Sequence, residues 1–236
     1  MLALLSSMAF ENDQILSHLK NVRKTRAAGK IIYRGRCSGH DILLVTSGVG
    51  KVNAASSATA VIENYPVRAV INFGVGGAYP DAGLNIGDVA IASKEIYGDE
   101  GVFTAAGIKG MKEIGIPLVR IGETKYFNEF PLDSPAIPFP KDENNMNIMI
   151  KTGNFITVSA VSGSQKRAKD LGKRFGAVCE NMEGAAIAQV CALYELPMIE
   201  LRGISNMAGV RDKRKWNLKI ASENCQKLVL ETIKKL

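Results

Sequence analysis

The sequence has few of the residues that would support a metal centre or a disulfide framework. Only two histidines and four cysteines occur among its 236 residues. The cysteines are widely spaced and match neither a zinc-ligand pattern nor a CxxC redox pair. We therefore expect buried free thiols in a reducing cytoplasm, and we expect neither a metal nor an organic cofactor. The four are Cys37, Cys179, Cys191 and Cys225.

Long apolar runs are also missing. None approaches the ~20 residues that a membrane-spanning helix needs. The apolar N-terminus lacks the basic residues of a signal peptide, and an acidic segment follows it closely. The pattern predicts a buried first strand in a cytoplasmic protein, with no membrane partner.

Basic residues are in excess but are not concentrated. The formal net charge is +7 and the isoelectric point is near 9.2. The one tight cluster is RDKRKW, residues 211–216, and no nucleic-acid-binding signature accompanies it. We interpret the charge as solvated surface and expect no nucleic-acid partner.

Apolar runs rich in Val and Ile alternate with helical patterns along the chain. Continuous apolar runs are typical of strands buried on both faces. The alternation predicts a single α/β domain over residues 1–236, with a largely parallel or mixed sheet flanked by helices. The predicted strands are 40–48, 67–77, 87–96, 154–163 and 197–206, and the predicted helices are 53–65, 165–176, 184–196 and a C-terminal helix from 217.

The segment from about 131 to 147 differs from the rest. It is rich in proline, acidic residues and asparagine, which oppose regular structure. We expect a surface excursion there that borders the functional site.

Two glycine-rich loops resemble nucleotide-binding motifs but fail their tests. SGVGKVNAA, residues 47–55, has Val45 and Val52 where a P-loop requires Gly and Ser or Thr. GVGGAY, residues 74–79, has Tyr79 where a dinucleotide fingerprint requires its third glycine. Each loop nevertheless ends a predicted strand, where open α/β sheets place ligands. A ligand-binding loop and a tightly packed turn are equally compatible with either sequence.

Five stretches in a fixed order resemble the purine nucleoside phosphorylase and nucleosidase superfamily. Segments 181–186 (NMEGAA) and 202–217 resemble its futalosine hydrolase branch in particular. The resemblance spans nearly the whole chain and implies a twisted mixed sheet in a homodimer or larger homo-oligomer. The five stretches are MAFEND, SGVGKVNAA, INFGVGGAY, ENMEGAAIA and ELRGISN.

The resemblance assigns sugar and base contacts. Met182 and Glu183 match the ribose-binding pair, and an ionised carboxylate can accept hydrogen bonds from two vicinal hydroxyls. Val161 matches a position whose backbone contacts the base, and Gly77 lies in the second glycine loop, where we also expect substrate contact. Glu180 is interpreted as an ordinary acid at a helix start.

The resemblance also assigns the acid that activates water to Glu11. From the sequence alone, Glu11 could equally be a surface acid on an N-terminal helix, and Glu100 and Glu123 remain alternatives. Val75 replaces a serine that often contacts phosphate or water, which favours hydrolysis over phosphorolysis. Arg202 lies near the water in relatives, although a strand arginine can also be an ion-pair partner.

Asn206 carries the prediction about the base. Adenine-specific relatives have an aspartate there, whereas hypoxanthine presents acceptors at N7 and O6 that suit the donors of an amide. Together with the resemblance, Asn206 therefore predicts a nucleosidase that releases hypoxanthine from a small-molecule nucleoside whose distal group the sequence does not define. The alternatives are a purine nucleoside phosphorylase, an adenine-releasing nucleosidase for methylthioadenosine or aminofutalosine, and a non-catalytic nucleoside-binding module.

Overall fold

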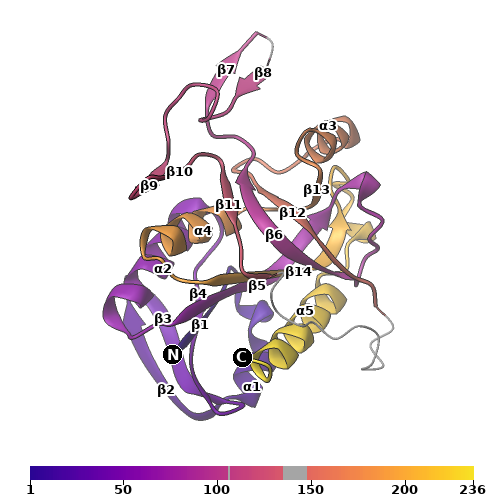
Figure 1. Cartoon of the computed structure of the whole chain (residues 1–236). Helices are drawn as coiled ribbons and strands as arrows, with labels where there is room; N and C mark the ends of the chain where they lie inside the picture. Colours follow the sequence, from indigo (N-terminus) through magenta and orange to yellow (C-terminus); the bar gives the residue numbers. More distant parts are fainter. Residues whose placement is uncertain (106, 135–147) are drawn as a thin grey trace.

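One large β-sheet forms the centre of the molecule (Figure 1). The computed structural model describes residues 1–105, 107–134 and 148–236 of the chain. The sheet has ten strands in the order β11-β6-β12-β13-β5-β1-β4-β3-β2, with β14 paired to both β5 and β6. Parallel and antiparallel pairs both occur, so the predicted mixed sheet is confirmed. Its strands are β1 (Leu2–Ser6), β2 (Lys20–Ala27), β3 (Lys30–Cys37), β4 (His40–Thr46), β5 (Ala69–Ala78), β6 (Val89–Tyr97), β11 (Glu129–Pro131), β12 (Ile150–Thr157), β13 (Ala177–Asn181) and β14 (Met198–Met207).

Part of this sheet closes on itself. β14 joins β5 to β6, while β12 and β13 connect β6 back to β5, so these five strands form a ring. Strands of this ring contribute small apolar residues to one shared core cluster, among them Ala90, Ala92 and Ala177, with Phe155 and Ile204 as larger members. The ring holds β5 and β14 side by side, and these two strands carry several of the predicted site residues.

Helices cover both faces of the open part of the sheet. The core behind α2 (Lys51–Asn64) and α4 (Gly184–Leu193) contains Ala3 and Leu5, whereas the core behind α1 (Asp13–His18) and α5 (Leu218–Ile233) contains Leu2 and Leu4. Figure 1 shows these two helix pairs on opposite sides of the sheet. Burial of alternate side chains on both faces explains why the central strands are apolar throughout.

The ends of two predicted helices follow recognisable sequence signals. Ser164 accepts a hydrogen bond from the Arg167 backbone N–H at the start of α3 (Gln165–Phe175), and Gly176 ends that helix with a left-handed φ of 56°. Asn217 accepts from the Ile220 N–H before α5. The four predicted helices and five predicted strands are all present, and most lie within a few residues of the expected bounds. The strand expected over 154–163 is the exception, because β12 spans Ile150–Thr157 and residues 158–163 form a loop instead.

Several short elements were not predicted. They are the β2–β3 hairpin, strand β13, the 3₁₀ turns η1 (Ala9–Glu11), η2 (Pro80–Ala82) and η4 (Lys213–Lys215), and the strands of the 102–131 region. In that region β7 (Val102–Thr104) pairs β8 (Gly107–Lys109) and β9 (Val119–Ile121) pairs β10 (Thr124–Tyr126).

The described start of the 131–147 segment, residues 131–134, is partly buried and is not the surface excursion that we predicted. Pro131 ends β11, and Ser134 is fully buried, with its hydroxyl accepting a hydrogen bond from the Glu200 N–H. Residues 135–147 of that segment lie outside the described residues.

Three further sequence expectations concern cysteines, membranes and the basic cluster. All four cysteines are free and buried, as predicted. Across the part of the chain that the structure describes, no helix is long and apolar enough to cross a membrane. Within the basic cluster, Arg211 lies over the ring of Trp216 and Arg214 forms an ion pair with Asp212.

Candidate active site

The candidate site lies where several strands end at the same edge of the sheet. β1 is parallel to β4 and β5, and β5 is parallel to β14, so their carboxyl ends point the same way. Polar loops follow β1 and β4, and glycines interrupt β5 beyond Phe73. This edge is where α/β sheets of this kind bind ligands.

Glu11 lies in η1, directly after β1, and its side chain points inward. One carboxylate oxygen accepts from the backbone N–H of Ser7 (3.0 Å) and of Met8 (2.8 Å) and from the Ser7 hydroxyl (3.0 Å). The other accepts from the Val75 N–H at 2.8 Å. Glu11 is 1% exposed, which excludes the interpretation as a surface helix acid. Burial raises the pKa of this carboxyl above its ordinary value, although Arg202 opposes the shift.

Gly74 allows Glu11 and Arg202 to approach the backbone of β5. A Cβ at this position would lie 2.5 Å from a Glu11 carboxylate oxygen and 3.0 Å from Nη1 of Arg202. Both side chains therefore occupy the space that any larger residue would need. The second glycine loop is thus a tightly packed turn, and the side chains packed against it are candidate catalytic residues. The two interpretations of its sequence, a ligand-binding loop and a packed turn, are therefore compatible.

Arg202 comes from β14 and is 1% exposed. Its Nε donates to the Glu200 carboxylate at 2.9 Å, and its Nη1 lies 3.6 Å from the Glu183 carboxylate. The surrounding carboxylates raise the pKa of the guanidinium, so it stays charged. Arg202 is thus an ion-pair partner and also a direct neighbour of two predicted site residues.

Glu183 immediately precedes α4 and is 5% exposed. One of its oxygens accepts from the Gly50 N–H at 2.9 Å, and the other faces Arg202. Asn181 shapes this turn because its side-chain oxygen accepts from the N–H groups of Glu183 (2.9 Å) and Gly184 (2.7 Å). Met182 lies half-buried within the same turn.

Asn206 and Gly77 are register partners on β14 and β5. A Cβ on Gly77 would lie 3.3 Å from Nδ2 of Asn206. That nitrogen donates to the Met207 carbonyl at 3.1 Å, and the Ser205 hydroxyl lies 2.9 Å from Oδ1. An amide nitrogen carries two hydrogens, so one N–H of Asn206 remains for another acceptor.

Glu180 is not a helix-start acid, and that prediction was wrong. It lies on β13, is 6% exposed, and accepts from the Ser162 N–H (2.9 Å) and hydroxyl (2.6 Å). It also faces Gly77 across the β13–β5 pair. Since Ser162 follows Val161 directly, Glu180 fixes the loop that carries Val161.

The structure separates Glu11 from the other acids considered for water activation. Glu123 is exposed, and Glu100 forms an ion pair with Lys51 at 2.8 Å. Arg202 lies beside both Glu11 and Glu183. Asn206 and Gly77 lie near the ends of β14 and β5, and Val161 lies in the loop after β12.

Two buried acids of this region were missed from the sequence. Glu95 on β6 and Glu200 on β14 are both 0% exposed. The available signal was a single acid inside an apolar strand pattern, because carboxylates are rarely buried without a partner. For Glu200 a second signal was available, because residues 200 and 202 of one strand point to the same face. A buried Arg202 therefore indicated Glu200 as its ion-pair partner.

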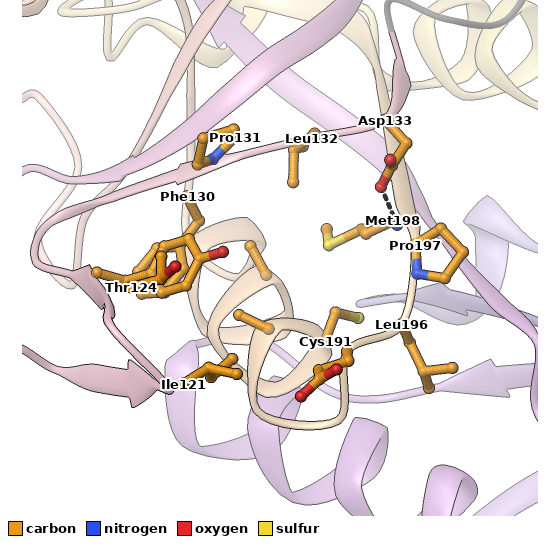
Figure 2. Close-up of a pocket in the computed structure, with 14 residues that line it drawn as sticks. Ile121, Thr124, Phe130, Pro131, Leu132, Asp133, Cys191, Leu196, Pro197 and Met198 are labelled. Carbon is orange, nitrogen blue, oxygen red and sulfur yellow. Dashed lines mark hydrogen bonds between the residues drawn. The ribbon is translucent and has the colours of Figure 1, made fainter.

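A separate hollow of about 470 Å³ lies at the other end of α4. Figure 2 shows its lining, with Phe130, Leu132 and Met198 above Cys191 and a hydrogen bond between Asp133 and the Met198 N–H. None of the predicted site residues lines it. We therefore place the candidate site at the cluster around Glu11 and Glu183 and not in this hollow.

Comparison with known proteins agrees with this arrangement. A family model described as "Phosphorylase superfamily" matches residues 2–234. The chain is 37% identical over 191 residues to a futalosine hydrolase of Thermus thermophilus, covering 81% of this chain and 80% of that protein. It is 32% identical over 211 residues to a 5'-methylthioadenosine/S-adenosylhomocysteine nucleosidase of Bacillus cytotoxicus, covering 88% and 86%.

Solved structures show the same fold. An S-adenosylhomocysteine nucleosidase of Streptococcus pyogenes, in complex with 5-methylthiotubericidin, superposes with a TM-score of 0.83 at 25% identity. It covers 100% of this chain and 96% of that one. A methylthioadenosine/S-adenosylhomocysteine nucleosidase from Colwellia psychrerythraea, in complex with adenine, gives 0.81 at 25% identity and covers 100% and 95%.

The fold is that of the nucleosidases that these structures represent. The chain belongs to the phosphorylase superfamily. Within that superfamily it is a nucleosidase, an N-glycosyl hydrolase.

Proposed function

We propose that this protein hydrolyses the N-glycosidic bond of futalosine and releases hypoxanthine. One observation carries the hydrolytic part of the proposal. Three backbone N–H groups, from Ser7, Met8 and Val75, converge on one spot at the strand ends, and the Glu11 carboxylate occupies it. Converging N–H groups are suited to an anion such as phosphate. Here an internal carboxylate uses these donors and repels a second anion, which favours water as the nucleophile.

Glu11 supplies the base for that water. As the bond between C1' and the purine nitrogen breaks, its electron pair moves to the base and the ribose becomes oxocarbenium-like. The water oxygen attacks C1' and its proton passes to Glu11. A carboxyl whose pKa is raised by burial is a better proton acceptor near neutral pH than an ordinary glutamate. No metal is required for these steps.

Glu183 and Met182 hold the ribose in this proposal. The Glu183 oxygen that lies 3.6 Å from Arg202 has no close hydrogen bond to that guanidinium, so it can accept from a ribose hydroxyl. Gly50 keeps the other oxygen in place. Arg202 offsets part of the buried negative charge of Glu11 and Glu183 and holds them near the reacting carbon.

Asn206 reads the purine together with Gly77 and the backbone of Val161. Its free N–H can serve one acceptor of a 6-oxopurine, N7 or O6, and stabilises the negative charge that the departing base gains. The Met207 carbonyl can only accept a hydrogen bond, so its contact with Nδ2 favours the amide orientation that presents nitrogen to the base. An aspartate at this position would present oxygen to both acceptors.

An open hollow of about 620 Å³ adjoins the sugar site and can take the 5' part of the nucleoside. Gly50, which binds Glu183, lines it together with Val49, Tyr97 and Ala186. The identity to a futalosine hydrolase supports a large 5' substituent there. The homo-oligomer implied by the family resemblance stays a prediction.

The test is a substrate comparison in the presence and absence of phosphate. Futalosine, inosine and methylthioadenosine are incubated with the enzyme, and the released base and sugar are quantified by chromatography. We expect hypoxanthine from futalosine in phosphate-free buffer, with a free sugar hemiacetal as co-product. Strict dependence on phosphate, with a ribose 1-phosphate product, would contradict hydrolysis.

A second candidate function is release of adenine from methylthioadenosine or a related nucleoside. The 32% identity to a methylthioadenosine/S-adenosylhomocysteine nucleosidase supports it. Asn206 opposes it because the amide cannot ionise or share a proton with N7 as an aspartic acid can. Faster cleavage of methylthioadenosine than of futalosine would decide for this candidate.

A further inference from the structure

Beneath the candidate site lie two buried carboxyl groups that none of the proposed steps uses. Glu95 and Glu200 reach the same point from β6 and β14. A Cβ built on Gly184 would be 2.1 Å from Oε1 of Glu95 and 2.5 Å from Oε2 of Glu200. The two oxygens are therefore close neighbours, and only a glycine fits above them.

These two oxygens differ in their other partners. Oε1 of Glu95 accepts from Nδ2 of Asn181 at 2.5 Å, and its Oε2 accepts from the Thr157 hydroxyl at 2.8 Å. Oε1 of Glu200 is bound by Arg202. Oε2 of Glu200 is fully buried and makes no hydrogen bond of ordinary geometry in the described structure. The side chain of Asn72, its register partner on β5, is a further donor near Glu200 and lowers the pKa of that carboxyl. A buried carboxylate oxygen without a donor is costly, and a proton on the facing oxygen of Glu95 would supply that donor.

We infer that Glu95 and Glu200 share one proton, which Glu95 carries, and that the pair positions Arg202 on one side and the Asn181–Gly184 turn on the other. Glu200 remains ionised and holds the guanidinium at 2.9 Å. Glu95 anchors Asn181, whose side chain in turn orders the N–H groups of Glu183 and Gly184. The pair thus connects the arginine and the ribose-binding glutamate of the site from below. This inference rests on the proposed function only for its kinetic consequences.

The electrostatic surroundings are consistent with a single shared proton. Burial and the charge of Glu200 raise the pKa of Glu95, and Arg202 opposes the rise. Arg202 also faces Glu11 and Glu183, so three carboxyl groups, those of Glu11, Glu183 and Glu200, surround the one guanidinium. Burial also raises the pKa of Glu200, and Arg202 opposes that rise as well. The neighbouring thiols and phenols have a pKa raised by burial and stay neutral: Cys179, Cys191, Cys225, Tyr79 and Tyr97.

Two isosteric substitutions distinguish this arrangement from a merely structural acid pair. Glu200→Gln removes the charge that compensates Arg202, so Arg202 acts more strongly on Glu11 and lowers its pKa. We expect kcat to fall at least tenfold, and we expect the acid limb of the pH–rate profile to move to lower pH. Glu95→Gln keeps a donor toward Glu200 but loses the hydrogen bond from Asn181. It should lower kcat by less than about tenfold and leave the acid limb in place.

The matched control is Glu129→Gln, because Glu129 pairs with Lys94 on the exposed edge of the same sheet. It should leave both the rate and the pH profile unchanged. An unmoved acid limb in Glu200→Gln, or an equal shift in both variants, would overturn the inference.

Infrared spectroscopy tests the proton directly and does not depend on activity or on the folding of Glu200→Gln. At mildly alkaline pH the wild type should show the carbonyl stretch of a protonated carboxylic acid, and Glu95→Gln should lose one such band. A wild type without that band, or an unchanged band in folded Glu95→Gln, would refute the shared proton. If the band behaves as expected but no nucleoside is cleaved, the proposed function fails and the proton pair stands.

Discussion

Replacement of Glu11 by alanine is the sharpest test of the proposed chemistry. The substitution removes the base and leaves the N–H groups of Ser7, Met8 and Val75 without their carboxylate. General base catalysis contributes about 10²–10⁴-fold, so kcat should fall by that factor. KM should change much less, because Glu11 contacts water rather than the base or the ribose in the proposed mechanism.

The fold should survive this substitution. Each backbone N–H left unpaired in a dry interior costs about 1–3 kcal/mol. Two effects offset that cost: the desolvation of a buried carboxylate is relieved, and the space left by the side chain can admit water to these donors. We therefore expect a net loss of no more than about 3 kcal/mol, with an unchanged circular dichroism spectrum.

The assay exploits the vacated donors. Formate is a small carboxylate that the three N–H groups can bind, so it should restore part of the activity of Glu11→Ala. Hypoxanthine release is followed in phosphate-free buffer across a formate titration, with chloride as the ionic-strength control and Glu129→Ala as the control variant. We expect at least about tenfold recovery in Glu11→Ala and no formate effect on the wild type or on Glu129→Ala.

Three outcomes would refute the reasoning. Activity of Glu11→Ala near that of the wild type would mean that another group activates water. A reduced rate that formate does not change would mean that these N–H groups do not hold a carboxylate for catalysis. Recovery by phosphate but not by formate, with a ribose 1-phosphate product, would indicate phosphorolysis.

Three more predictions follow from the same contacts. Glu183→Gln should lower kcat/KM at least tenfold without unfolding, because a charge-assisted hydrogen bond contributes about 1.5–3 kcal/mol; steady-state kinetics with unchanged activity would show that Glu183 does not bind ribose. Asn206→Asp should lower kcat/KM for the hypoxanthine nucleoside relative to its 6-amino counterpart, with any gain for the 6-amino substrate growing as pH falls; an unaltered ratio at two pH values would show that this residue does not read the base. Because the pKa of Glu95 is raised, the folded state binds more protons than the unfolded state, and this carboxyl stabilises the fold less as pH rises above 4.5. In urea titrations between about pH 5 and about pH 8, the wild type should therefore lose more free energy of unfolding than Glu95→Gln. Parallel losses in the two proteins would contradict this.

The family and most of the framework could be predicted from sequence. The five long strands and four helices have strong apolar periodicity, because each buries one or both faces in a shared core. β2 was missed because most of its side chains are exposed and polar, so it carries no apolar pattern. Its partner β3 was missed because its apolar run is short, residues 31–33, and polar residues and a glycine follow it. β13 was missed because five residues are too few to establish a period.

The sequence by itself determined which residue types reach the site. Glu11, Glu183, Arg202 and Asn206 were identified from motifs, and hydrolysis of a 6-oxopurine nucleoside follows from their chemistry as a hypothesis. Only the tertiary structure decided how they act on one another. Glu11 meets the N–H of Val75 and the guanidinium of Arg202 because η1, β5 and β14 converge, although these residues lie far apart along the chain.

Burial is the property that the sequence could not supply. Glu180 follows an apolar run and precedes an apolar helix, so its local pattern is that of a helix-start acid. The β13–β5 pair instead turns it inward, toward Ser162. Glu95 and Glu200 look like isolated acids in two separate strands, and only β6, β14 and the glycine at position 184 bring them together. Solvation and charge pairing depend on contacts between distant segments, and these are formed only when the sheet closes.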